Sequence, residues 1–171
     1  GYVLIVEGGR IDHASHHNDA YRMVSETLAF DRAIGASFSL VDSSETLTIV
    51  TADHETGGLS LNGYSDLKST KREDFIRKKC DQKKKSLVSW ASGPKHKENK
   101  EDICLDTLAT HYAPSAAHTA VDVPLLSRGV CASDFSGFVE NEDIAWKLLK
   151  CLGLNFDSRV NYDNHSLFNK R

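Results

Sequence analysis

Hydrophobic and polar positions follow two different periods over the first fifty residues. The apolar run at residues 2–7 is short, mostly β-branched or aromatic, and ends at Gly8-Gly9, which is typical of a buried strand. From about residue 18 to residue 38, apolar side chains recur at helical spacing, which predicts an amphipathic helix. A turn at residues 42–44 precedes a second β-branched run at residues 46–51. Strand, helix and strand in this order predict a right-handed βαβ unit with parallel strands.

The weaker pattern of the second half predicts four shorter elements, namely a helix at about 74–79, strands at 87–91 and 121–126, and a helix at about 142–152. Pro124 favours an edge position for its strand, because proline cannot donate to a ladder. For the last helix, Asn141 is a plausible N-cap and Gly153 a plausible stop. The predicted fold class is α/β, with a central, mostly parallel sheet flanked by helices.

Composition limits the architecture to one compact domain or one large piece of one, since 171 residues with 40% apolar content can bury a core. No run of about 18 apolar residues exists that could span a bilayer. The chain opens without methionine and inside an apolar run that is too short for a signal peptide. We therefore expect the sequence to be a fragment of a longer protein.

The four cysteines, Cys80, Cys104, Cys131 and Cys151, follow no metal-binding spacing. Two disulfides and four buried thiols are both compatible with them. Asn164 begins a glycosylation sequon, which matters only if the chain is secreted. It weakly favours an extracellular protein.

Basic residues are concentrated in one stretch. Residues 68–101 hold twelve of the 21 Lys and Arg but only five acidic residues. No interleaved aromatic residues or nucleic-acid-binding motif accompany this charge. A solvated surface insertion is therefore favoured over a nucleic-acid interface.

Candidate metal ligands follow both strands of the predicted βαβ unit, where open α/β sheets place their sites. They are Glu7, Asp12, His13, His16 and His17 after the first strand, and Asp53 and His54 after the second. Asp12 and His16 are four residues apart, so a helical turn after Gly9 would put both on one face, and carboxylate with imidazole suits zinc. Glu7 offers oxygen to a harder cation such as magnesium. His118 is a distant candidate for completing the first zinc site.

Each of these features has a simpler explanation when taken alone. An Asp and a His four apart on a helix are usually a solvated pair, and an Asp-His step after a strand is usually a cap or turn. A single histidine such as His118 has no partner that identifies it. Two clusters with complementary ligand types at the same sheet edge are harder to explain in this way. The combination therefore favours a metal site.

Two strings carry a more specific pattern, Val6-Glu7-Gly8-Gly9-Arg10-Ile11-Asp12-His13 and Thr51-Ala52-Asp53-His54. Both resemble the alkaline phosphatase family. The resemblance is close over residues 2–64 and resumes at residues 90–94 and 118–129, while the basic stretch at about 65–112 corresponds to a variable surface region of animal members. It implies that residues 1–171 are the C-terminal part of a single alkaline-phosphatase-like domain.

The resemblance also implies a ligand set and a reaction. Asp12, His16 and His118 would hold a first zinc, Asp53 and His54 a second zinc and Glu7 a magnesium, with His13 near the phosphate. The expected reaction is hydrolysis of phosphate monoesters through a phosphoserine intermediate. Active members are homodimers, and animal members are commonly lipid-anchored on the extracellular face of the plasma membrane.

This chain departs from the family's pattern in two ways. Ala116-Ala117 precedes His118, where many relatives have a more polar run. The family's nucleophilic serine, the third ligand of the second zinc and the phosphate-binding arginine all precede the matching segment, so we expect the isolated chain to be inactive. Asp42-Ser43-Ser44 lies before the second predicted strand and is a turn rather than a substitute nucleophile. Another two-metal phospho- or sulfohydrolase and a non-catalytic metal-binding domain are the alternatives.

Overall fold

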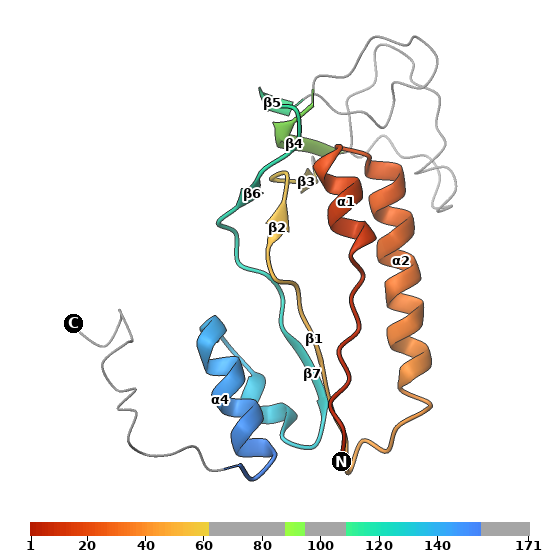
Figure 1. Cartoon of the computed structure of the whole chain (residues 1–171), viewed down its shortest axis with the longest axis vertical. Helices are drawn as coiled ribbons and strands as arrows, with labels where there is room; N and C mark the ends of the chain where they lie inside the picture. Colours follow the sequence, from red (N-terminus) through yellow and green to blue (C-terminus); the bar gives the residue numbers. More distant parts are fainter. Residues whose placement is uncertain (62–87, 95–108, 155–171) are drawn as a thin grey trace, which may run out of the picture. The chain divides into compact units, whose positions relative to one another are not determined.

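The computed structural model describes residues 1–61, 88–94 and 109–154 (Figure 1). The chain forms two compact units, one from Gly1–Val41 with Thr51–Pro124, the other from Asp42–Val50 with the residues from Leu125 onward. Helices and short strands occur in both units. The predicted helix at 74–79 and much of the basic stretch lie outside the described residues.

Two helices run side by side in the first unit (Figure 1), α1 at Arg10–His16 and α2 at Ala20–Ser37. The chain turns between them at Asn18, which is fully buried and left-handed at φ 55°. Asp19 then caps α2, accepting a hydrogen bond from the backbone N–H of Arg22 at 2.9 Å. The helix predicted at 18–38 is therefore confirmed, and a separate helical turn precedes it.

A three-stranded sheet carries the core of the first unit. Its strands are β3 (Ser60–Leu61), β4 (Val88–Gly93) and β5 (Ala109–Tyr112), with β3–β4 antiparallel and β4–β5 parallel. Ala20 of α2 packs with Val88, Trp90 and Ala109 of this sheet, and Met23 and Leu59 cover the cluster. Trp90 is only 1% exposed, so it anchors α2 against β4.

A two-residue antiparallel ladder lies beside this core. It joins β2 (Glu55–Thr56) to β6 (His118–Thr119), with Thr56 opposite His118. Gly57 follows β2 and is hydrogen-bonded on both sides, since its N–H donates to the Ala117 carbonyl and its carbonyl accepts from the Ala91 N–H, each at 2.8 Å. The ladder is thereby fixed to β4.

The second unit consists of an antiparallel pair, a short 3-10 helix and a closing helix. β1 (Leu47–Val50) pairs with β7 (Leu126–Gly129), and η1 (Ala132–Phe135) leads to α4 (Asn141–Cys151). A disulfide joins Cys131 to Cys151, which resolves the state of these two cysteines. Cys80 and Cys104 lie outside the described residues. Gly153 is left-handed at φ 66° and ends α4 as predicted.

The predicted parallel βαβ unit is wrong. Residues 2–7 form no strand, the side chains of residues 2–6 are 63–89% exposed, and β1 pairs antiparallel with β7 instead. An apolar run becomes a strand only where another strand completes its backbone hydrogen bonds, and the run itself does not specify that partner. The α/β class holds, with mixed rather than mostly parallel pairing among the described strands.

Two smaller expectations also differ from the structure. No strand covers residues 121–125, and β7 begins only at Leu126, beyond Pro124, which has no N–H to donate. Asn141 is the first residue of α4 rather than its cap, because Glu140 occupies the N-cap position in extended conformation. Among the described residues, no helix has the length and apolar character required to cross a membrane.

Gly57 provides a test of how the ladder is held. Its φ of +88° is strained for an L-residue, and a Cβ there would lie 2.5 Å from Cε3 of Trp90. Gly57→Ala should lower the free energy of unfolding by about 2 kcal/mol or more in denaturant titrations. The matched control is Gly35→Ala in α2, where a Cβ would meet nothing within 4 Å. This variant should raise the free energy of unfolding by about 0.5–1 kcal/mol, because alanine favours the helix over glycine. Equal stabilities for the two variants would contradict this packing.

Candidate metal centre

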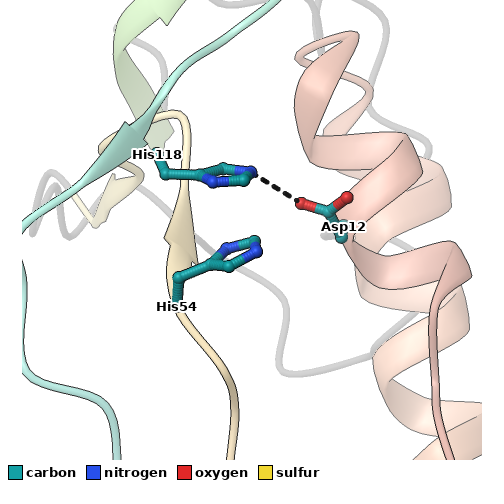
Figure 2. Close-up of side chains that lie close together, drawn as sticks. All are labelled: Asp12, His54 and His118. Carbon is teal, nitrogen blue, oxygen red and sulfur yellow. Dashed lines mark ion pairs between the residues drawn. The ribbon is translucent and has the colours of Figure 1, made fainter.

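Side chains from three separate segments of the first unit converge at one point. Figure 2 shows the Asp12 carboxylate of α1 facing the imidazoles of His54 and His118, which come from the segment before β2 and from β6. One ligand atom from each of these residues lies within 4.8 Å of the other two. His16, one turn after Asp12 on α1, points to the same place. The turn after Gly9 is helical, as the Asp12–His16 pairing required.

The distances among Asp12, His16 and His118 match a zinc coordination shell. Nε2 of His16 lies 3.3 Å from Oδ2 of Asp12 and 3.2 Å from Nε2 of His118, and Nε2 of His118 lies 3.6 Å from Oδ1 of Asp12. Ligand atoms about 2.0–2.1 Å from a tetrahedral zinc ion are about 3.3 Å from one another. The three side chains are therefore spaced to share one such ion.

The protonation of His16 also suits metal binding. Its Nδ1 lies 2.7 Å from the carbonyl oxygen of Ala116, which can only accept, so Nδ1 carries the proton. In the neutral form of this tautomer, the Nε2 lone pair is directed at Asp12 and His118. A backbone carbonyl that orients a ligand histidine in this way is a common feature of zinc sites.

His54 has the same arrangement with a different carboxylate. Its Nδ1 faces the Glu55 carbonyl at 3.2 Å, and its Nε2 lies 3.1 Å from Oδ2 of Asp53. The Asp53 side chain is 83% exposed. The His54 ring stacks on His118 with 3.5 Å between centroids, so the Asp53–His54 pair adjoins the first group.

Thr56 is a functional candidate that sequence reasoning missed. It is buried, and its hydroxyl donates to Oδ1 of Asp12 at 2.5 Å while lying 3.3 Å from Nδ1 of His54. Burial alone would raise the pKa of Asp12. The Thr56 hydrogen bond and the attraction of the three neighbouring imidazoles outweigh burial, so the pKa of Asp12 lies below its ordinary value. The carboxylate is thus kept ionised and fixed in orientation. A threonine two residues after a ligand histidine carries no sequence signal of this role.

Glu55 is a second residue that the sequence did not indicate. Its side chain accepts hydrogen bonds from the Thr119 hydroxyl and, at 2.9 Å, from the Leu59 N–H. Burial raises the pKa of Glu55, but these bonds and others from the backbone of Gly58 and Thr119 lower it by more, so the net pKa is depressed. Glu55 is therefore an ionised group that holds the two strands of the ladder together.

Two of the predicted site residues lie apart from this cluster. The side chains of Glu7 and His13 are exposed and make no hydrogen bond or ion pair with another described residue. Asp42 accepts from the Ser44 N–H at 2.8 Å and from the Ser44 hydroxyl at 2.7 Å, as expected for a turn. Magnesium binding by Glu7 and phosphate contact by His13 stay predictions.

The cluster offers the donors that zinc prefers. The imidazoles of His16, His54 and His118 lie around the Asp12 carboxylate, whose depressed pKa keeps it ionised. Imidazole nitrogen together with carboxylate oxygen is a donor set of zinc sites.

Comparison with known proteins identifies the family. The alkaline phosphatase family model matches residues 1–154. Alkaline phosphatase 3 of Bacillus subtilis (strain 168) is 30% identical, and the alignment covers 91% of this chain and 41% of that protein. The human tissue-nonspecific alkaline phosphatase is 31% identical, and the alignment covers 91% of this chain and 32% of that protein. The membrane-bound alkaline phosphatase of Bombyx mori is 34% identical, and the alignment covers 81% of this chain and 25% of that protein. The chain belongs to the alkaline phosphatase family, as its two strings predicted.

The fold agrees with a solved structure of the same family. A mutant of the TAB5 alkaline phosphatase with magnesium bound in its M3 site superposes with a TM-score of 0.54 at 29% identity, over 88% of this chain and 35% of that one. The α/β class is thereby confirmed. The chain spans between a quarter and about two-fifths of the length of these relatives.

Removing the Thr56 hydroxyl tests its role at Asp12. In metal-free protein, Thr56→Val should raise the pKa of Asp12, since the lost hydrogen bond favoured the charged form, and zinc affinity should fall by about 10-fold. Carboxyl-carbon NMR titration and competition with a coloured chelator measure the two effects. Thr56→Ser retains the hydroxyl and serves as the control. An unchanged Asp12 pKa in the valine variant would refute the assignment.

Proposed function

We propose that this chain is the C-terminal, metal-binding part of a single alkaline phosphatase domain that hydrolyses phosphate monoesters through a phosphoserine intermediate. The observation that carries the proposal is the zinc-like spacing of Asp12, His16 and His118, in a chain that belongs to the alkaline phosphatase family. The variable surface insertion that we propose within about 65–112 does not include β4 and β5, because their residues Val88, Trp90 and Ala109 are buried in the core.

The proposed centre holds two zinc ions and one magnesium ion per subunit. Asp12, His16 and His118 bind the first zinc, and Asp53 and His54 bind the second. The stacking of His54 on His118 supports neighbouring sites. Magnesium at Glu7 and phosphate near His13 rest on the resemblance of the Val6–His13 string, and bound magnesium in the TAB5 relative is consistent with the former.

Each chain residue has a defined part in the proposed reaction. The ions, when bound, supply positive charge that stabilises the transferring phosphoryl group and lowers the pKa of the attacking oxygen. Asp12 contributes a permanent negative charge, since its pKa is depressed. His16 and His54 contribute neutral Nε2 donors, each fixed in orientation by a backbone carbonyl at Nδ1. The nucleophilic serine, the third ligand of the second zinc and the phosphate-binding arginine come from residues that precede this chain in the complete protein.

The partners and location that we propose for the complete protein rest on resemblance to the same family. It is a homodimer that acts on phosphate monoesters, with no nucleic-acid partner, and it lies on the extracellular face of the plasma membrane through a lipid anchor outside this segment. The membrane-bound relative from Bombyx mori, the Cys131–Cys151 disulfide and the sequon at Asn164 support this location.

His16 gives the most direct test in the complete protein. His16→Ala should remove the first zinc and reduce turnover of a chromogenic phosphate ester at alkaline pH by more than about 100-fold, because losing a residue that only orients a ligand already costs about 10- to 100-fold. A chelator should abolish turnover of the unmodified protein. His17→Ala alters an exposed neighbour on the same turn and should change neither zinc content nor turnover. Full zinc content in the His16 variant would overturn the ligand assignment.

The isolated chain should behave differently from the complete protein. We expect residues 1–171 alone to bind zinc weakly and to show no hydrolysis of a chromogenic phosphate ester, because the nucleophile and the arginine are supplied by other residues. Chelator-sensitive turnover by the purified chain would show that these groups are present in it and would contradict the proposed division of the site.

A further inference from the structure

The ladder that carries His118 is short, and its other bonds precede that histidine, at Ala116 and Ala117. β2 and β6 pair over only two residues each, Glu55 opposite Thr119 and Thr56 opposite His118. A pairing of this length is marginal in water unless side chains support it. The His118 side chain is itself 45% exposed, so burial in a core does not fix its position.

Glu55 adds support on the other side of His118, through the Glu55–Thr119 pair of the ladder. One carboxylate oxygen accepts from the hydroxyl of Thr119, the residue that follows His118. The other accepts from the N–H of Leu59 at 2.9 Å, beyond the Gly57-Gly58 turn. A single carboxylate therefore fastens β6 to β2 and to the turn that follows β2. Hydrogen bonds to an ionised acceptor are about twice as strong as those between neutral groups.

The position of Glu55 links it to both proposed zinc sites. His54 precedes Glu55 in the chain, and the backbone carbonyl oxygen of Glu55 lies 3.2 Å from Nδ1 of His54. Across the ladder, its partner Thr119 adjoins His118, whose ring stacks on His54. A shift of β6 relative to β2 would therefore separate His118 from Asp12 and His16 and would also break the ring stacking.

From this geometry we infer that Glu55 is a positioning residue of the metal centre, which acts through Thr119 to hold His118 within reach of the first zinc. The inference rests on the proposed function, because it requires zinc at Asp12, His16 and His118. Neither Glu55 nor Thr119 touches the ion itself in this arrangement.

The test measures zinc release from the complete protein into excess coloured chelator. Glu55→Gln weakens the clamp, and Thr119→Val removes only the hydroxyl while preserving side-chain shape. Each should speed release of one zinc about 10- to 100-fold. The double variant should speed release by less than the product of the two single effects, because both changes act on the Glu55–Thr119 hydrogen bond. Glu45→Gln, at an exposed carboxylate, is the matched control and should behave like the unmodified protein.

A second readout separates positioning from general stability. In cobalt-substituted protein, the visible spectrum reports coordination geometry, and it should change in the Glu55 and Thr119 variants but not in the Glu45 variant. If Glu55→Gln does not fold, Thr119→Val alone carries the test. Release rates and spectra equal to those of the control would overturn the role of Glu55 while leaving the proposed function intact. An unmodified protein that retains no zinc would overturn both.

Discussion

The proposed metal centre depends on a reciprocal pair of hydrogen bonds between His16 and Ala116. The Ala116 N–H donates to the His16 carbonyl at 2.8 Å, and the Ala116 carbonyl accepts from Nδ1 of the same histidine at 2.7 Å. The first bond joins the end of α1 to the segment that enters β6, and the second selects the tautomer of the ligand. Ala116 is only 3% exposed, and a Cβ on Gly57 would lie 3.5 Å from its own Cβ. A small residue therefore suits this position.

Helical and extended segments contribute to the centre in different ways. Asp12 and His16 share a face of α1 because they are one turn apart, so local structure alone brings them together. His118 lies about a hundred residues away and depends on the short β2–β6 ladder, on Ala116 and on the Glu55 clamp. Each of these bonds contributes only about 0.5–1.5 kcal/mol, or somewhat more where a charge is involved. The geometry of His118 is therefore the most easily disturbed part of the centre.

The sequence predicted the family better than it predicted the strands. Helical periodicity located α2 and α4, and the strings at Val6–His13 and Thr51–His54 predicted the family, because ligand spacing and glycine turns are local properties. The parallel βαβ unit was wrong, since strand pairing is decided by distant residues and β1 pairs with β7. Thr56 and Glu55 were missed for a related reason. Their hydrogen bonds to Asp12 and Thr119 cross 44 and 64 residues, and no spacing along the chain signals them.

The most direct measurement is anomalous diffraction at the zinc absorption edge from crystals of the complete protein. The account predicts a strong peak at about 2.0–2.2 Å from a carboxylate oxygen of Asp12 and from Nε2 of both His16 and His118, with a second peak next to Asp53 and His54. Zinc bound elsewhere, or no peak between Asp12, His16 and His118 in zinc-saturated crystals, would contradict it.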